Sequence, residues 1–108
     1  MSAYAIAHLR HVEWGPDIVT YIQEITDTLD AHGGRFLVHG DNPVVMEGPF
    51  PGHLVVIEFP SMDHARAWYQ SDAYQAILPL RTQNADGATV LVQGVAPGYR
   101  ASELLAKH

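Results

Sequence analysis

The chain contains no cysteine and few basic residues, and both shortages exclude classes of function. Without cysteine there is no disulfide, no thiol nucleophile and no cysteine-based metal site. Six lysine and arginine residues stand against twelve aspartate and glutamate residues, which gives a net charge of −6. A chain this acidic, without a cluster of basic residues, is not expected to bind nucleic acid or an anionic membrane surface.

Long hydrophobic runs are also absent, which bears on the expected cellular location of the protein. No apolar stretch approaches the roughly 20 residues that a membrane-spanning helix needs. The N-terminal segment MSAYAIAHLR lacks the charged start and the long apolar core of a secretory signal peptide. We therefore expect a cytoplasmic protein with no membrane partner.

Motifs that depend on a fixed spacing are missing as well. The chain has no glycine-rich phosphate loop, nucleophile elbow or dinucleotide fingerprint. Its seven histidines include no HxH or HExxH spacing. His8 and Glu58 with one more imidazole would make a two-histidine, one-carboxylate site, but no further histidine is expected beside them. We therefore expect no metal site and no cofactor.

The chain does have enough apolar residues for one domain. Its 108 residues are 47% hydrophobic, a normal content for a globular core. No repeat or low-complexity segment divides it. We expect a domain over residues 1–96 and a C-terminal tail over residues 97–108.

Residues 55–81 carry the strongest structural signal. An apolar run typical of a buried strand stops at Pro60. Ser61 is placed to cap one helical segment, and either Ser71 or Asp72 the next. Another helix is expected from Pro16, because isoleucine and leucine recur after it at steps of three and four. Strands are expected at residues 3–11, 35–39, 53–59 and 88–94, with residues 44–47 as a candidate short strand.

The order strand, helix, strand, strand, helix, strand predicts a ferredoxin-like α+β fold, βαββαβ, with an antiparallel sheet. Its helices cross over on one face of that sheet, which leaves the other face to be covered. Alternation along the strands sorts the side chains into two sets. One set is wholly apolar and includes Val38, Val90 and Val92, and the other mixes apolar with polar residues. Neither is typical of a solvated face, so we expect a homodimer.

Polar side chains of the mixed set predict a candidate site. We expect the strand order 4-1-3-2 with strands one and three parallel, so that His8 and Glu58 lie at the same end. Arg35 opens the antiparallel second strand and Thr89 opens the last strand, so both are expected beside Glu58. His39 is expected at the far end of the same face.

Two interpretations of this cluster stay open. In one, Arg35 and Glu58 form a structural ion pair. In the other, they line a cleft in which Arg35 binds a carboxylate, carbonyl or enolate oxygen. Glu58 or His8 is then the catalytic group that transfers a proton.

Two tyrosines and a second arginine are further candidates for ligand contacts. Tyr69 and Tyr74 lie in the second helical region, either as core aromatics or as phenols that hydrogen-bond a ligand carbonyl. Arg81 is placed to interact with a helix C-terminus, or to contact a ligand or a second protomer.

Several segments are similar to one known family. They are GGRF at 33–36, EG at 47–48, VVIEFPS at 55–61, AWYQSDAYQ at 67–75, LPLR at 78–81 and VLVQG at 90–94. With these segments the chain resembles the family called domain of unknown function 1330, of the dimeric α/β-barrel superfamily. The resemblance implies a homodimer in which two sheets pair face to face with the helices outside. It implies no particular reaction, because members of this superfamily do unrelated chemistry on one scaffold.

The leading functional hypothesis is a small-molecule-binding protein or a cofactor-independent enzyme. Acid–base chemistry on a small oxygenated compound, such as isomerisation or cyclisation, suits the candidate residues because no activated nucleophile is visible. One alternative is a non-catalytic dimeric ligand-binding or accessory protein with a structural Arg35–Glu58 pair. Another, by analogy with the superfamily alone, is a cofactor-free monooxygenase.

Overall fold

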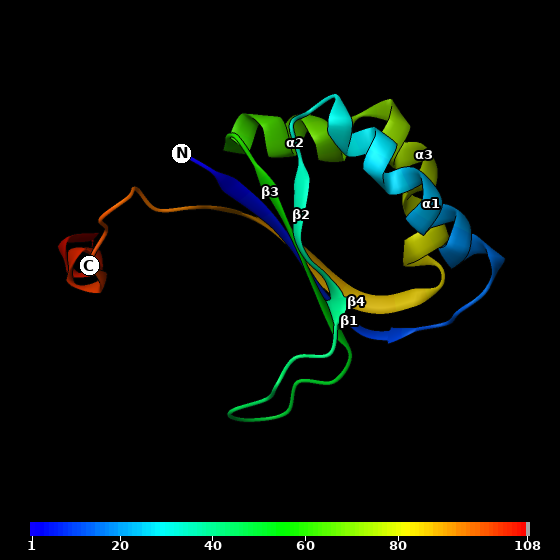
Figure 1. Ribbon diagram of the computed structural model, residues 1–108, viewed down its shortest axis with the longest axis horizontal. Helices are drawn as coiled ribbons and strands as arrows, with labels where there is room; N and C mark the ends of the chain where they lie inside the picture. The colour runs from blue at the N-terminus through cyan, green and yellow to red at the C-terminus, as the bar shows by residue number, and fades with distance from the viewer. Residues whose placement is uncertain (108) are drawn as a thin grey trace.

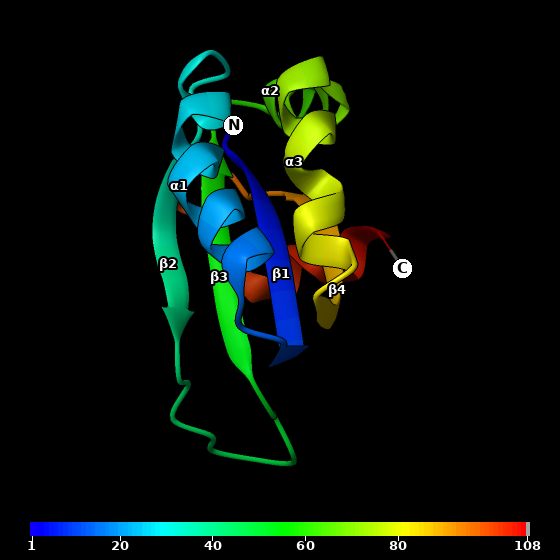
Figure 2. The same cartoon turned by 90° about the vertical axis from the view of Figure 1, so that its right-hand side faces the viewer.

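The computed structural model describes residues 1–107, and at Asp41 it describes the backbone alone. Four strands form one antiparallel sheet in the order β2-β3-β1-β4, and the helices cover one of its faces (Figures 1 and 2). The elements are β1 (Ala3–Val12), α1 (Pro16–Asp30), β2 (Arg35–Asp41), β3 (His53–Phe59), α2 (Met62–Gln70), α3 (Asp72–Thr82), β4 (Ala85–Gln93) and the 3-10 helix η1 (Ala101–Lys107). The predicted ferredoxin-like order is confirmed, with the second helical region divided into α2 and α3.

Local sequence signals determine where the helices begin. Pro16 lies in the first turn of α1, where its missing N–H needs no partner. Ser61 Oγ accepts a hydrogen bond from the His64 backbone N–H at 3.2 Å, and Ser71 Oγ accepts one from the Tyr74 N–H at 3.2 Å. Both serines are N-caps, which confirms the prediction for Ser61 and selects Ser71 over Asp72 for the second segment. Because Ser71 follows α2 directly, α3 starts there and places Tyr74 in the core.

The core lies between the helices and the sheet. Its largest fully buried side chains include Trp68, Tyr74 and Phe59. The Trp68 ring centre lies 5.3 Å from that of Phe59 and 4.1 Å from that of Tyr74. The Trp68 indole N–H donates to Thr28 Oγ1 at 3.0 Å. This cluster joins α1, α2 and α3 to β3.

β1 and β3 are antiparallel, which corrects the expected strand directions. The crossover through α1 makes β2 parallel to β1, and β3 then returns from β2 in the opposite direction and lies between them. Tyr4 therefore pairs with Glu58, and His8 pairs with Leu54. The predicted match of His8 with Glu58 at one end of the sheet is wrong.

A register shift in β2 moves two side chains to faces other than those predicted. Between Phe36 and Val38 the pairing with β3 shifts by one residue, so that Val38 pairs with Val56 and His39 with Val55. One extra residue in a strand reverses the alternation after it. His39 therefore lies on the helix side of the sheet, and Val38 lies on the outer face.

β4 also departs from the prediction. It begins at Ala85, three residues before the expected start of the strand at residue 88. Thr89 pairs with Ala7 and lies on the helix side, whereas Val90 lies on the outer face.

The outer face of the sheet carries one row of aliphatic side chains that crosses all four strands. Val38 pairs with Val56, Val56 with Ile6, and Ile6 with Val90. We call these four residues the aliphatic row. Val38 and Val90 are 37% and 54% exposed. The neighbouring row, nearer the start of β1, contains Arg35, Glu58, Tyr4 and Val92.

The β2–β3 connection, residues 42–52, forms no strand, so the short strand expected at 44–47 is absent from it. Gly52 ends this connection with φ +91°, and a Cβ there would collide with the backbone of β1 at Leu9. Glycine is therefore required at the point where β3 begins.

After Gly94 the chain leaves the sheet on the side opposite the helices and ends in η1, which buries no residue (Figures 1 and 2). The division into a domain over 1–96 and a tail over 97–108 stays a prediction. Within residues 1–107, no helix has both the length and the apolar character needed to cross a bilayer.

Candidate functional site

A cleft of about 230 Å³ lies between the helices and the sheet. Its walls come from all four strands and from α1, α2 and α3. Most lining side chains are apolar, including Ala5, Ile25 and Ile57. Its size is adequate for a small ring compound, since a cavity of about 150 Å³ is enough for benzene.

The cleft exists because a central strand of the sheet presents small side chains to the helices. Ala3, Ala5 and Ala7 alternate along β1 on that face, and Ala5 and Ala7 line the cleft. Larger residues surround them, with Ile57 and Val55 on β3 and Tyr21 on α1. Space above the alanines is therefore left between side chains that keep the helices away from the sheet.

Two tyrosine hydroxyls and an arginine form the polar part of the wall on the helices. Tyr21 and Tyr74 are 9% and 1% exposed, and their hydroxyl oxygens lie 2.7 Å apart. The Arg81 guanidinium carbon lies 5.9 Å from the centre of the Tyr21 ring. Burial raises the pKa of the Tyr21 hydroxyl, so this hydroxyl stays protonated and able to donate a hydrogen bond.

Two buried polar atoms on the wall of the sheet have no hydrogen-bond partner among the described residues. They are His53 Nδ1 on β3 and Thr89 Oγ1 on β4, and both residues line the cleft. Buried polar atoms are usually hydrogen-bonded, because leaving one unpaired costs about 1–3 kcal/mol. Each of these two residues therefore carries an unsatisfied polar atom at the wall of the cleft.

The predicted contact between Arg35 and Glu58 is confirmed, but it lies on the outer face of the sheet. Arg35 Nη2 is 2.7 Å from Glu58 Oε1, and the Tyr4 hydroxyl donates to Glu58 Oε2 at 3.4 Å. The Arg35 side chain is 71% exposed. The hydrogen bond from Arg35 lowers the pKa of Glu58, which makes this carboxylate a weaker base. Of the two interpretations, these features favour the structural ion pair.

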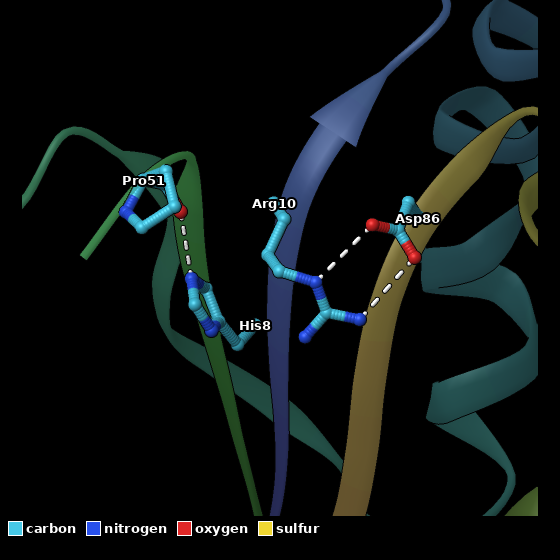
Figure 3. Close-up of polar contacts among 4 residues, drawn as sticks. All are labelled: His8, Arg10, Pro51 and Asp86. Atoms are coloured by element: carbon cyan, nitrogen blue, oxygen red, sulfur yellow. Dashed lines mark hydrogen bonds and ion pairs between the residues drawn. The ribbon is translucent and has the colours of Figure 1, made fainter. Parts of the chain in front are cut away.

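His8 lies at the other end of the outer face. Its Nε2 is 2.7 Å from the carbonyl oxygen of Pro51 (Figure 3), and its ring stacks on Phe50 with centres 4.1 Å apart. Nearby, Arg10 holds Asp86 through two hydrogen bonds of 3.2 Å (Figure 3). The expected cluster of His8, Thr89 and the Arg35–Glu58 pair is therefore wrong in geometry. The antiparallel pairing of β1 with β3 separates His8 from Glu58, and Thr89 lies on the helix side of the sheet.

The remaining predicted residues divide between the cleft and the core. Tyr74 and Arg81 line the cleft. Tyr69 is half-buried, and its ring packs against Trp68 and Tyr74 with centres 6.0 and 5.5 Å away. The roles of all three in binding a ligand stay predictions.

The sequence interpretation missed Tyr21 and His53 as residues of the cleft. Tyr21 shares a helical face with Ile18, Ile25 and Thr28, which a search for polar side chains within the apolar stripe would have found. His53 alternates with Val55 and Ile57 along β3, so period two places it on the helix side.

No metal centre is evident in the part of the chain that the structure describes. Across residues 1–107, no group of three histidine, aspartate or glutamate side chains is placed to hold a metal ion.

Comparison with known proteins identifies the family. A family model described as a domain of unknown function, DUF1330, matches residues 2–95. The chain is a member of the DUF1330 family. No curated protein matches this DUF1330 chain.

Solved structures share its fold at low sequence identity. A protein of unknown function from Rhodopseudomonas palustris is 17% identical, with a TM-score of 0.66 over 89% of this chain and 84% of that one. A dimeric ferredoxin-like protein of unknown function from Jannaschia sp. CCS1 is 11% identical, with a TM-score of 0.58 over 87% and 100% of the two chains. An antibiotic biosynthesis monooxygenase is 18% identical, with a TM-score of 0.53 over 89% and 100%. At these identities the likeness extends to the fold alone.

Proposed function

We propose that this DUF1330 protein binds a small, largely apolar, oxygen-bearing compound in the cleft between the helices and the sheet. The observation that carries the proposal is the pair of unpartnered buried atoms, His53 Nδ1 and Thr89 Oγ1, in an otherwise apolar wall. A ligand oxygen or N–H group that reaches them removes the cost of leaving them unpaired.

The position of these two atoms sets the size of the ligand. His53 pairs with Leu9 and Thr89 with Ala7, so β1 lies between them. Two strand spacings and two residues of strand length separate their Cα atoms by roughly 12 Å. A bicyclic compound with an oxygen substituent at each end matches that span and the cleft volume of about 230 Å³.

Acid–base chemistry is the reaction class that suits these groups. Imidazole takes up and returns a proton near neutral pH, and a tyrosine hydroxyl with a guanidinium stabilises an enolate oxygen. Isomerisation or cyclisation next to a carbonyl needs only those two functions. Cofactor-free oxygenation rests on likeness of fold alone, and a purely ligand-binding protein would use the same cleft without turnover.

The proposal includes a homodimer formed through the outer face of the sheet. An antiparallel sheet with one solvated face normally carries polar residues there, whereas the aliphatic row exposes Val38 and Val90 by 37% and 54%. Contiguous exposed apolar surface of this kind marks interaction sites. The dimeric ferredoxin-like protein from Jannaschia sp. CCS1 supports this arrangement by analogy.

Binding of 2-acetyl-6-methoxynaphthalene, a neutral bicyclic ketone with an ether oxygen at its other end, tests the cleft. We expect calorimetry to show binding by the wild type, with the affinity reduced about twofold to tenfold in Thr89→Val and in His53→Leu, the loss of one neutral hydrogen bond each. Thr26→Val on the exposed side of α1 and His11→Gln at the end of β1 are matched controls, since both residues are exposed and neither lines the cleft. No binding, or equal loss in the controls, would contradict the proposal.

A further inference from the structure

Arg81 is a cation at the wall of the cleft, and no acidic side chain among the described residues pairs with it. It is half-buried on the last turn of α3 and lines the cleft. The arginine ion pairs in the described part of the chain belong to Arg10 and Arg35, on other surfaces. No aspartate or glutamate is among the residues that line the cleft. A buried cation is normally paired with an anion, because its desolvation is otherwise uncompensated.

The groups beside Arg81 add a hydrogen-bond donor. Tyr21 and Tyr74 have two hydroxyl hydrogens, and the contact between their oxygens at 2.7 Å uses one of them. The second hydrogen has no acceptor elsewhere in residues 1–107. This wall of the cleft therefore offers a guanidinium and an O–H donor side by side.

The opposite walls contribute no negative charge. Besides Arg81, the ionisable side chains on the lining are the two tyrosines, His39 and His53. Asp17, at the start of α1, accepts a hydrogen bond from Asn84 Nδ2 at 3.3 Å and does not line the cleft. A chain with a net charge of −6 thus encloses a site that is positive or neutral.

We propose that the cleft selects small organic anions, specifically aromatic or alicyclic monocarboxylates. The carboxylate binds the Arg81 guanidinium and the free tyrosine O–H, while the ring lies over Ala5 and Ala7. Guanidinium and carboxylate match in shape and charge, and their attraction is stronger in an apolar cleft than in water. This inference rests on the proposed function, because it specifies the ligand of the same site.

Two matched ligands test the inference. At neutral pH 2-naphthoate is an anion, whereas 2-naphthamide has nearly the same shape and no charge. We expect calorimetry on the wild type to show about tenfold tighter binding of 2-naphthoate, as for one charge-assisted hydrogen bond. Arg81→Gln should abolish this preference while it continues to bind 2-naphthamide. Arg66→Gln, which removes an exposed arginine of α2, should retain it.

The outcomes separate the inference from the proposed function. If neither ligand binds the wild type, the proposed function is wrong. If the amide binds as tightly as the carboxylate, or if Arg81→Gln keeps the preference, the anion inference is overturned although the cleft remains a binding site. Should Arg81→Gln fail to fold, Tyr21→Phe provides a second test, because loss of the O–H donor should also weaken the preference for the carboxylate. An unchanged preference in Tyr21→Phe would then overturn the inference.

Discussion

His8 and His53 have different surroundings because alternation places them on opposite faces of the sheet. Both lie near the same end, since His8 pairs with Leu54 and His53 with Leu9. His8 Nε2 is held by the Pro51 carbonyl, whereas His53 Nδ1 has no partner in the described chain. The residue type does not distinguish them. The face on which each lies determines that His8 contacts the β2–β3 connection and that His53 lines the cleft.

The pH dependence of folding stability tests whether Glu58 forms a structural ion pair with Arg35. The hydrogen bond from Arg35 lowers the pKa of Glu58 in the folded protein. In the unfolded chain Glu58 has the ordinary, higher pKa of a glutamate and takes up its proton at a higher pH. Between the two pKa values of Glu58 the unfolded state binds more protons than the folded state. The ion pair therefore stabilises the protein fully above the unfolded-state pKa, and this stabilisation is lost as the pH falls through the lowered pKa of the folded protein.

We therefore expect Glu58→Gln to lower the urea midpoint of unfolding at neutral pH, with the difference from the wild type disappearing on acidification through this range. Glu47→Gln, in the exposed β2–β3 connection, should change the midpoint little at any pH. A difference for Glu58→Gln that persists under acidic conditions would show that the charge is not its cause.

At the scale of elements, Ser71 links two helices. Its hydroxyl oxygen accepts a hydrogen bond from the Tyr74 N–H, and its O–H donates one to the Trp68 carbonyl oxygen at 2.7 Å. Ser71→Ala removes both bonds, and we expect the free energy of unfolding to fall by about 1–2 kcal/mol, measured by chemical denaturation. Ser102→Ala, in the exposed η1, should leave it within about 0.5 kcal/mol. Equal effects of the two substitutions would indicate that the α2–α3 junction does not depend on this cap.

The sequence was sufficient to predict elements, but not how side chains register across the sheet. Ser61, Ser71 and Pro16 carry local signals that need no tertiary information, and the helices begin where these residues predict. The Arg35–Glu58 contact was predictable because the second and third strands of the predicted fold pair antiparallel, which brings the start of one beside the end of the other. The reversal of His39 was not, since the shift in β2 adds one residue that leaves no clear sequence signal.

At the scale of the whole molecule, our proposals assign ligand binding to one face of the sheet and dimerisation to the other. The helix side carries small alanines and two unpartnered polar atoms, which suit a ligand. The outer side carries the aliphatic row, which suits a flat apolar partner. In Figure 1 the segment after β4 and η1 also lie on the outer side, with Leu105 75% exposed. An association through that side would leave the helices, and the cleft beneath them, outside the interface.

Val90 provides a direct test of this association. It is 54% exposed within the aliphatic row, so Val90→Lys adds a charge where the two sheets are proposed to meet. An interface with twofold symmetry contains the lysine of each protomer. Desolvation of both charges should raise the dissociation constant of the dimer at least about tenfold. Analytical ultracentrifugation should therefore detect dimers of the wild type and monomers of the variant at the same concentration. Val19→Lys is the matched control, since Val19 is 46% exposed on α1 in the helix layer. If Val90→Lys sediments like the wild type and Val19→Lys, the outer face is not the interface.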